Sequence, residues 1–334
     1  MDRVRWGILG TGRIATAFAA GLTEVPEAEL VAVGSRSLAG AAAFGERVGA
    51  IRRHGSYKAL AADTDVDIVY VATPHPFHHA HSRLCLEAGK AVLCEKPFTL
   101  NAAQAQDLVA LATERHLFLM EAMWTRFLPA MVRLRRLIAA GAIGEVRFVS
   151  ADFGFRQEFD PAHRLYDPAL GGGALLDIGV YLVSFASMLL GPPTEIRSLV
   201  TMAPSGVDAD TALLFGYGGG RAAQLLASIT TATPQLATIV GTAGSLTIHP
   251  LWWKPTRLTL VVDGEEPEVI DLPFAGNGYN DEAVEAMRCL RDGETESPAM
   301  PLAETIAILE TLDRVRADWG LRYPMEIPGQ GATT

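Results

Sequence analysis

The 334-residue chain lacks an excess of positive charge: 28 Lys and Arg residues stand against 38 Asp and Glu residues, a formal net charge of −10. Nucleic acids and anionic membranes attract basic surfaces, so we expect neither as the main partner. Cysteine is also scarce, because only Cys85, Cys94 and Cys289 occur and no C-x-x-C spacing joins them. This argues against a disulfide framework and favours the reducing cytoplasm as the compartment.

Long uncharged apolar runs are missing as well, and no stretch of about 18 such residues indicates a membrane span. The beginning, MDRVRWGILG, has no apolar segment and cleavage site of the kind that signal peptides carry. The most apolar stretch, Gly171–Gly191, carries Asp177 and opens with glycines, so we predict a buried helix there. A chain that is 49% hydrophobic and 20% charged is globular, and its length suits two domains.

Short β-branched runs alternate with helical patterns over the first 120 residues, which predicts βαβ units and a parallel, doubly wound sheet. The predicted strands are Val4–Leu9, Glu29–Ser35, Asp67–Thr73, Ala91–Cys94 and Leu117–Met120. The predicted helices are Ile14–Leu22, Leu38–Val48, Phe77–Ala88 and Asn101–Arg115.

The pattern changes after a predicted helix at Pro129–Ala140, and longer alternating segments follow that predict a mostly antiparallel sheet, open on one face. Its strands are expected at Glu145–Arg156, Glu195–Ala203, Thr211–Tyr217, Arg221–Thr231, Ala237–Gly241, Ser245–Ile248, Arg257–Val262 and Glu268–Leu272. Helices are expected at Gly173–Leu190, Gly278–Asp292 and Leu302–Trp319, and the tail from Gln330 to Thr334 is expected to be loose.

We therefore predict an α/β fold of two domains. A Rossmann domain spans residues 1–122, and a second α/β domain with the open sheet spans residues 123–334. The helix at 302–319 is a candidate to pack back on the first domain.

The motif GILGTGRIA predicts a dinucleotide site. Gly10 permits the tight turn after the first strand, Gly12 lets a pyrophosphate approach the backbone, and Ala15 allows close helix packing. The phosphates then lie at a helix N-terminus, where free N–H groups attract anions. A glycine turn after a strand can also be merely structural, but its position inside a βαβ unit favours cofactor binding.

The end of the second predicted strand bears on which dinucleotide binds. Enzymes that use NAD usually carry Asp or Glu there, bonded to the ribose 2′-hydroxyl. This chain has Gly34, Ser35 and Arg36, and a guanidinium can fork onto a 2′-phosphate. NADP is therefore favoured over NAD, although a surface arginine in water is the alternative explanation.

The CEKP motif is the first candidate for catalysis, because Lys96 stands where the predicted strand Ala91–Cys94 ends. Ligands of open α/β sheets bind beyond the carboxyl ends of the strands, so Lys96 is placed to face the cofactor. Pro97 biases Lys96 away from helical geometry and ends the strand. A simple ion pair between Lys96 and Glu95 is the alternative.

The motif GGGALLDIGVY supplies the second candidate, with Asp177 and Tyr181 four residues apart on one predicted helix and so on one face. A phenol titrates near pH 10, and a neighbouring ammonium lowers that pKa, so a Tyr beside a Lys can exchange a proton with a substrate hydroxyl. A buried Tyr–Asp hydrogen bond that only orders the core is the alternative.

The histidine-rich segment HPFHHAH invites a zinc hypothesis, but half of it lies on a predicted helix and no cysteine is suitably spaced. We therefore predict no metal site. Of these histidines, His75 and His78 lie nearest the end of the strand before them and are candidates to line the pocket.

Five ordered motifs together carry a resemblance: GTGRIA, TPHPFHH, AVLCEKP, FLMEAMWTRF and GGGALLDIGVY. In this order they resemble the glucose–fructose oxidoreductase, inositol dehydrogenase and MocA superfamily. MEAMWTRFLPA and ESPAMPLAET most resemble the branch of dimeric dihydrodiol dehydrogenases and NADP-dependent D-xylose dehydrogenases. The similarity runs from Val4 to about Trp319.

The resemblance implies a role for each matching residue. Lys96 polarises the reacting oxygen, Tyr181 is the acid or base where inositol dehydrogenases have histidine, and Asp177 completes the catalytic set. Arg36 holds the 2′-phosphate. The implied cofactor residues are Gly10, Thr11, Gly12, Arg13, Ile14, Ser35, Arg36, Thr73, Pro74, His75, His78, Glu95, Lys96, Trp124 and Arg126. The implied substrate residues are Lys96, Trp124, Phe153, Asp177, Tyr181 and Trp253.

The implied function is NADP-dependent hydride transfer between nicotinamide and a carbinol carbon of a D-xylose-type aldose or a trans-dihydrodiol. Aromatic walls suit either substrate. Reduction of a keto sugar such as 1,5-anhydrofructose and oxidation of a cyclitol stay open. A non-catalytic NADP-binding regulator and an NAD-dependent glycoside-cleaving enzyme are further alternatives. The resemblance also implies a homodimer through the open sheet of the second domain.

Overall fold

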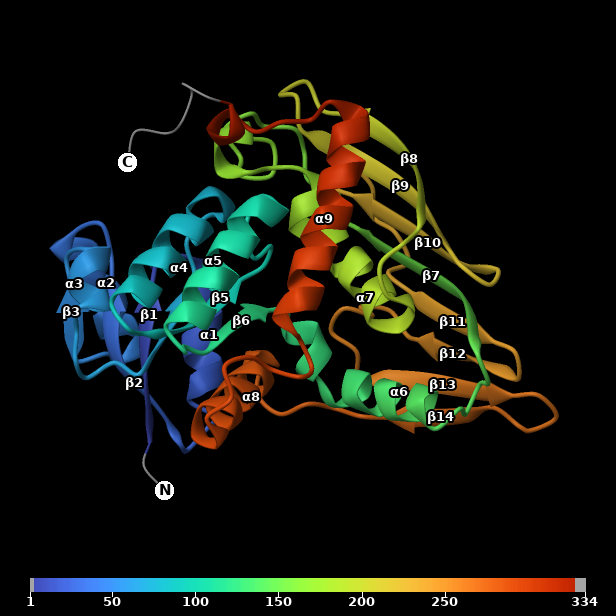
Figure 1. The fold of residues 1–334 in the computed structure, drawn as a ribbon, viewed down its shortest axis with the longest axis horizontal. Helices are drawn as coiled ribbons and strands as arrows, with labels where there is room; N and C mark the ends of the chain where they lie inside the picture. The colour runs from blue at the N-terminus through green and yellow to red at the C-terminus, as the bar shows by residue number, and fades with distance from the viewer. Residues whose placement is uncertain (1–2, 328–334) are drawn as a thin grey trace. The chain divides into compact units, whose positions relative to one another are not determined.

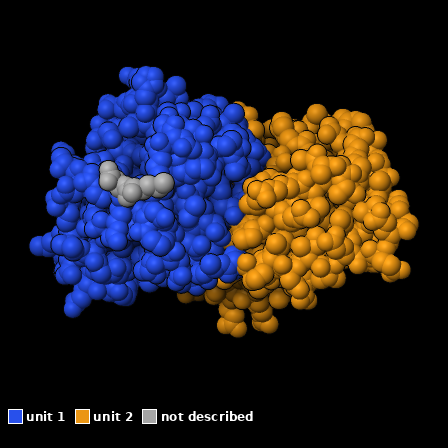
Figure 2. Space-filling view, turned by 90° about the horizontal axis from the view of Figure 1, so that it is seen from below, with its two compact units in different colours: residues 1–127, 274–306 blue, residues 128–273, 307–334 orange. Residues whose placement is uncertain are grey.

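The structure is a computed structural model that describes residues 3–327, so the predicted loose tail lies outside the described residues. The chain divides into two compact units, shown in different colours in Figure 2. Unit 1 comprises Met1–Phe127 and Phe274–Ile306, and unit 2 comprises Leu128–Pro273 and Ala307–Thr334. The domain boundary after residue 122 stays a prediction.

Unit 1 is built on a parallel sheet of six strands in the order β3-β2-β1-β4-β5-β6 (Figure 1). The strands are Arg52–His54 (β3), Ala28–Gly34 (β2), Val4–Leu9 (β1), Ile68–Val71 (β4), Ala91–Glu95 (β5) and Leu119–Ala122 (β6). The chain runs outward from β1 to β3 and then restarts at β4 on the other side of β1. This reversal creates the crevice at which doubly wound sheets bind their ligands, and the predicted Rossmann fold is confirmed.

Helices flank this sheet, and α8 joins unit 1 from late in the sequence by packing on α1 and η2. The helices of unit 1 are Arg13–Leu22 (α1), Leu38–Val48 (α2), Tyr57–Ala61 (α3), His75–Phe77 (η1), His78–Glu87 (α4), Ala102–Glu114 (α5), Trp124–Phe127 (η2) and Tyr279–Asp292 (α8). The division between the units falls inside Leu302–Trp319 (α9).

Four short elements of unit 1 were not predicted from the sequence: β3, α3 and the single turns η1 and η2. Strand β3 has only three residues, Arg-Arg-His, and helix α3 has five, so neither carries the apolar period on which the predictions rest. The other predicted elements are present with ends shifted by at most two residues, because capping groups and not apolar patterns set the ends.

Unit 2 contains an eight-stranded sheet in the order β14-β13-β12-β11-β7-β10-β9-β8. The strands are Glu268–Asp271 (β14), Arg257–Val262 (β13), Gly244–Ile248 (β12), Ala237–Gly241 (β11), Val146–Gly154 (β7), Arg221–Ser228 (β10), Asp208–Tyr217 (β9) and Glu195–Met202 (β8). Only the pair of β10 and β7 is parallel, so the predicted mostly antiparallel sheet is confirmed.

One face of this sheet is covered by Pro129–Ala139 (α6) and Val180–Leu190 (α7), which pack against β13 and against β7 and β10 (Figure 1). The other face is open. Leu199, Ala212 and Leu226 are paired across β8, β9 and β10 on this open face, and Leu199 is 77% exposed.

The helix predicted at Gly173–Leu190 is not continuous. Leu175–Gly179 forms a π-helical turn (η4), and α7 follows it. The π turn changes the spacing that the sequence implied between Asp177 and Tyr181, and such turns are frequent at functional sites. The apolar stretch Pro168–Leu190 is long enough to cross a membrane by length and composition alone, but 83% of its most apolar window is buried, as expected for a core helix.

Candidate functional site

The glycine loop between β1 and α1 leaves room for a phosphate. Gly10 has φ +108°, and a Cβ added there would lie 2.7 Å from the Ala72 carbonyl oxygen, so only glycine fits. A Cβ at Gly12 would meet nothing within 4 Å. Gly12 also caps α1 without a side-chain hydrogen bond, and the first turn carries no acid. The open space and free N–H groups fit a pyrophosphate.

The end of β2 presents a guanidinium and no carboxylate. Ser35 is buried, Arg36 is exposed, and Ser37 caps α2 by accepting a hydrogen bond from the Gly40 N–H at 3.1 Å. Burial raises the pKa of Tyr57, and the charge of nearby Arg36 opposes that rise. Arg36 therefore directly precedes the N-cap of α2 and is near enough to Tyr57 for its charge to act on that hydroxyl, an arrangement able to bind an anionic group.

The histidines after β4 are engaged in local contacts. His78 is buried, with its ring nitrogens 2.8 Å from the Pro97 carbonyl oxygen and 2.7 Å from the Thr73 carbonyl oxygen, so it ties together the loops after β4 and β5. His81 lies 3.0 Å from the Thr73 hydroxyl, and burial lowers the pKa of His81 to about 4. Within residues 3–327, no group of three or more His, Cys, Asp or Glu side chains could hold a metal ion.

The EKP motif follows directly on β5, as the sequence predicted. Glu95 ends the strand and is buried; it accepts a hydrogen bond from the Tyr70 hydroxyl and another from the Lys96 backbone N–H at 3.1 Å. The Lys96–Pro97 peptide bond is cis. Burial lowers the pKa of His78, and the positive charge of Lys96 lowers it further, so the Lys96 ammonium lies near that ring.

The segment after β6 is held from within unit 1. Trp124 is buried and stacks on Tyr279 of α8 with ring centroids 4.5 Å apart. The guanidinium of Arg126 is buried and lies 2.7 and 2.8 Å from the two carboxylate oxygens of Glu304. Both residues are therefore placed by packing and charge pairing, and their contact with a cofactor stays a prediction.

In unit 2, Asp177 is paired with an arginine that the sequence analysis did not select. Its carboxylate oxygens lie 2.9 and 3.4 Å from two guanidinium nitrogens of Arg164. Leu175, the first residue of the π turn, donates its backbone N–H to the Asp208 carboxylate at 2.6 Å. This hydrogen bond anchors the start of the turn. The helix segment that carries Asp177 and Tyr181 is thus fixed at its beginning.

The predicted aromatic residues of unit 2 do form one cluster. Phe153 stacks on Trp253 with ring centroids 4.9 Å apart and planes 6° from parallel, and its centroid is 5.7 Å from that of Tyr181. The Trp253 indole N–H donates to Gln235 at 3.2 Å. A phenol hydroxyl beside two flat apolar rings suits a cyclic substrate that carries hydroxyl groups.

The structure therefore assembles the predicted residues as one group in each unit. In unit 1 these residues follow the carboxyl ends of the parallel strands, and in unit 2 Asp177 and Tyr181 lie on the π turn and on the helix that follows it. Sequence reasoning missed Arg164 and Tyr279, since no motif spacing marks them. Only the position of Tyr279 at the start of a predicted helix gave a signal.

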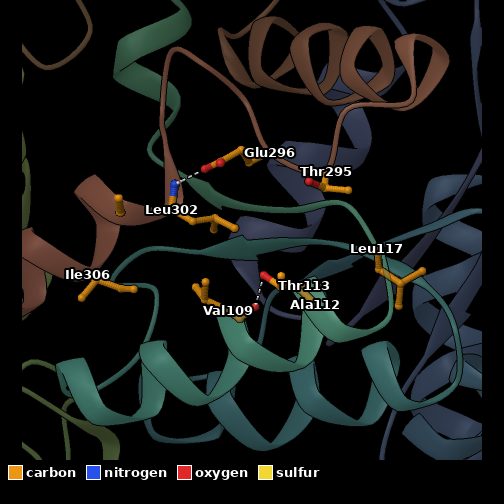
Figure 3. Close-up of a pocket in the computed structure, with 9 residues that line it drawn as sticks. Val109, Ala112, Thr113, Leu117, Thr295, Glu296, Leu302 and Ile306 are labelled. Atoms are coloured by element: carbon orange, nitrogen blue, oxygen red, sulfur yellow. Dashed lines mark hydrogen bonds between the residues drawn. The ribbon is translucent and has the colours of Figure 1, made fainter.

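A separate hollow of about 230 Å³ lies in unit 1 between α5 and the segment that leads into α9 (Figure 3). Glu296 accepts the Leu302 N–H at 2.7 Å on one side, and Thr113 donates to the Val109 carbonyl on the other. The hollow is lined by Val109, Ala112, Thr113, Leu117, Thr295, Glu296, Leu302, Ala303 and Ile306. None of the predicted site residues lines it.

Comparison with protein families agrees with the fold and the glycine loop. The model of an oxidoreductase family with an NAD-binding Rossmann fold matches residues 4–123, and the model of the GFO/IDH/MocA C-terminal domain matches residues 131–247. The chain belongs to the Gfo/Idh/MocA oxidoreductase family. The predicted resemblance is confirmed, and this family member is a dehydrogenase or reductase with an NAD(P)-binding Rossmann fold.

Curated members of the family match this chain over nearly its whole length. Trans-1,2-dihydrobenzene-1,2-diol dehydrogenase from Mus musculus is 40% identical over 335 residues, covering 97% of this chain and 99% of the relative. Among solved structures, a 3-ketoreductase from Actinomadura kijaniata with NADP and TDP-benzene has a TM-score of 0.84 at 29% identity, covering 95% and 98%. Aldose-aldose oxidoreductase from Caulobacter crescentus with glycerol has a TM-score of 0.87 at 25% identity, covering 96% and 99%.

Proposed function

We propose that this family member is an NADP-dependent dehydrogenase that oxidises one hydroxyl of a cyclic vicinal diol. The substrate is a trans-dihydrodiol or the ring form of a D-xylose-type aldose. The observation that carries this proposal is the cluster of Phe153, Trp253 and Tyr181, with the Asp177–Arg164 pair on the helical turn just before Tyr181. Flat rings take the apolar face of the substrate, and the polar groups take its hydroxyls. The 40% identity to dihydrodiol dehydrogenases supports the same substrate class.

In this proposal three side chains act on the substrate. Tyr181 removes the proton of the reacting hydroxyl, Lys96 hydrogen-bonds the same oxygen and favours the phenolate of Tyr181, and Asp177 accepts a hydrogen bond from the neighbouring hydroxyl. The bound nicotinamide supplies the hydride acceptor. The π turn of η4 sets where the Asp177 and Tyr181 side chains point.

The preference for NADP rests on the end of β2. Arg36 is exposed there, and the strand end carries Gly34, Ser35 and Arg36 where an NAD enzyme usually has Asp or Glu. The N-terminus of α2 adds N–H donors for an anion. The ketoreductase that shares this fold was solved with NADP. We infer that Arg36 and the start of α2 hold the 2′-phosphate.

A second candidate function is the reduction of a keto sugar. It is favoured by the similarity to the 3-ketoreductase, whose structure aligns over 95% of this chain. The same side chains serve both directions, because Tyr181 returns the proton to the oxygen when a carbonyl is reduced.

We also propose that two copies of the chain pair through the open face of the eight-stranded sheet. Leu199, Leu214, Leu226 and Val240 are exposed on it, although large apolar side chains rarely gather on the surface of a monomer. A second copy with the same face would bury them through a symmetric interface.

A substrate panel tests the proposed function. Trans-dihydrodiols, aldoses and cyclitols are assayed with NADP⁺ and with NAD⁺ at the nicotinamide absorbance, and keto sugars are assayed with the reduced cofactors. We expect turnover of a trans-dihydrodiol or an aldose with NADP⁺. Turnover of keto sugars alone would assign the second candidate, and turnover of glycosides with tightly held NAD would overturn both.

A further inference from the structure

One peptide group just beyond Lys96 is held at both ends by buried side chains. It is the group that joins Pro97 to Phe98. A ring nitrogen of His78, on α4, lies 2.8 Å from the Pro97 carbonyl oxygen. The Phe98 N–H donates to Oε1 of Glu121, on β6, at 3.1 Å. His78 and Glu121 are each 1% exposed, so two core side chains from different elements fix the plane of one peptide group.

Side chains replace the sheet as the support of the backbone at this point. The ladder between β5 and β6 pairs Cys94 with Glu121 and Glu95 with Ala122, and β5 ends at Glu95. Beyond that residue the Phe98 N–H reaches the Glu121 side chain, and the Phe98 carbonyl oxygen accepts the Cys94 thiol at 3.5 Å. The path of the chain after Lys96 therefore depends on these side-chain contacts.

Glu121 is itself held in place from the start of α9. The hydroxyl of Thr305, which is fully buried, donates to Oε2 of Glu121 at 3.1 Å, while Oε1 accepts the Phe98 N–H. Each carboxyl oxygen thus has a donor of its own. Breaking either hydrogen bond would leave a buried polar group unpaired, so the carboxyl group is a firm point of attachment.

The contact between Glu121 and Phe98 does not require a charge on the carboxyl group. Burial raises the pKa of Glu121 to about 7, against the hydrogen bonds from Thr305 and Phe98 and the positive charge of Arg126, and the charge of Glu304 raises it further. The protonated and the ionised carboxyl both keep an oxygen that can accept an N–H. The length of this side chain is therefore what the contact needs.

We propose that Glu121 is a positioning residue for catalysis, which acts through the Pro97–Phe98 peptide group to set where the Lys96 ammonium stands. Strand β5 fixes the backbone before Lys96, and His78 and Glu121 fix it after. A lysine whose backbone is fixed on both sides reaches fewer positions. Accuracy of this kind matters, because a misplacement of about 1 Å can lower a rate by about 100-fold. The inference rests on the role that the proposed function gives to Lys96.

Two variants separate the length of the Glu121 side chain from its charge. Glu121→Gln keeps the length, and its amide can accept the Phe98 N–H and donate to the Thr305 hydroxyl. Glu121→Asp keeps the carboxylate but is one methylene too short to reach Phe98. We expect Glu121→Gln to keep kcat within about threefold and Glu121→Asp to lower it by about 10- to 100-fold. The reverse order would assign an electrostatic role to Glu121 and overturn the proposal.

Thr305→Val is the matched control for stability. It removes the other hydrogen bond of the same carboxyl group and leaves the bond to Phe98. We expect its melting temperature to fall about as much as that of Glu121→Asp, while its kcat stays near that of the wild type. An equal loss of kcat in both variants would show that activity follows stability and not the position of the segment, which contradicts the proposal.

A double-mutant cycle tests whether Glu121 acts through Lys96. Residues that act as a unit are not additive, so Glu121→Asp should lower kcat by less than about twofold when Lys96→Ala is already present. The dissociation constant of NADP⁺ should change by less than about threefold in Glu121→Asp, because this variant leaves the glycine loop and Arg36 unchanged. Full additivity in the cycle would mean that Glu121 acts by another route.

Hydrogen exchange of the Phe98 amide, measured by NMR on the full chain, needs no substrate. We expect exchange to be about tenfold faster in Glu121→Asp and unchanged in Glu121→Gln, because only the shorter side chain releases the N–H. An unchanged rate in Glu121→Asp would refute the inference. Near-normal turnover of Lys96→Ala would instead refute the proposed role of the lysine and this inference with it. A normal kcat of Glu121→Asp beside an inactive Lys96→Ala would refute the inference alone.

Discussion

Arg164 forms an ion pair with Asp177, in which Nη1 lies 2.9 Å from Oδ1 and Nη2 lies 3.4 Å from Oδ2. The side chain of Asp177 is 7% exposed and that of Arg164 is 50% exposed, so the pair joins a buried acid to a base at the surface of unit 2. Paired contacts of this kind fix the plane of a carboxylate as well as its charge. Asp177 is thereby held ready to accept a substrate hydroxyl.

Replacing this arginine tests that link. We expect Arg164→Ala to lower kcat/KM by about 10- to 100-fold, because hydrogen bonds to charged groups contribute about 1.5–3 kcal/mol. Arg164→Lys keeps the positive charge but cannot make two parallel hydrogen bonds, so its kcat/KM should lie between those of the wild type and of Arg164→Ala. Steady-state kinetics on the best substrate of the panel measures the effect, with the melting temperature as a check of folding. An Arg164→Ala variant with unchanged kcat/KM would show that Asp177 does not depend on Arg164.

The assigned chemistry is tested by Lys96→Ala and Tyr181→Phe. Each should lower kcat by about 10²- to 10⁴-fold, the usual contribution of a positioned acid or base. Lys58→Ala, at an exposed position of helix α3, is the matched control and should keep full activity. Near-normal turnover of the Lys96→Ala variant would remove that residue from the mechanism.

The cofactor preference is tested by Arg36→Ala. We expect the dissociation constant of NADP⁺ to rise by about 10- to 100-fold, since a charge-assisted contact to phosphate is lost, while that of NAD⁺ hardly changes. Arg133→Ala, at an exposed position of α6, is the control and should affect neither cofactor. An equal loss for both cofactors would refute the phosphate role of Arg36.

The anchor of the π turn predicts a pH effect on stability. Burial raises the pKa of Asp208 to about 6, whereas an unfolded Asp titrates near pH 4. The contribution of this group to stability is therefore complete below about pH 4 and declines as the pH rises to about 6, by about 3 kcal/mol for two pKa units.

Asp208→Asn should remove this decline, which melting temperatures from pH 4 to pH 7 would measure. Asp63→Asn is a control of opposite sign, because Arg52 and His54 help to lower the pKa of Asp63 to about 2 despite the opposing effect of burial. A decline in the Asp208→Asn variant equal to that of the wild type would contradict the assignment.

The proposed dimer is tested by placing charge on the open sheet. Leu226 lies on β10 near the middle of that face. Leu226→Glu should convert a dimer to a monomer in sedimentation velocity, because a buried unpaired charge destabilises an interface. Val284→Glu, an exposed apolar position on α8, is the control and should leave the assembly unchanged. A wild-type monomer would contradict the proposal directly.

The fold could be predicted from the sequence wherever a periodic apolar pattern was long enough. Strand β1 and helix α2 were predicted to the residue, because each is bounded by glycine or by a capping serine. Strand β3 could not be predicted, since its three polar residues form a strand only because they pair with β2. The π turn at Leu175–Gly179 could not be predicted either, because its mostly apolar residues are equally compatible with a regular α-helix.

The residues of the candidate site likewise fall into those that the sequence predicts and those that only the structure reveals. The glycine loop, Arg36 and Lys96 follow from their positions relative to strands, and these positions can be read from a pattern. Arg164 and Tyr279 became visible only through their partners: a carboxylate thirteen residues away for Arg164, and for Tyr279 the ring of Trp124, far upstream on η2. Contacts over such separations depend on tertiary packing, which a single sequence does not display.

Helix α8 has a consequence for how the protein is made. It packs on α1 and η2 in unit 1, yet it follows the whole eight-stranded sheet of unit 2 in the chain. A ribosome thus synthesises α1 and η2 well before α8, the helix that packs on both of them. A nascent chain that stops before Phe274 leaves the apolar sides of α1 and η2 exposed to water. The unit that carries the glycine loop is complete only after Ile306 has been synthesised, so a truncation before Phe274 damages a unit whose sheet lies far upstream.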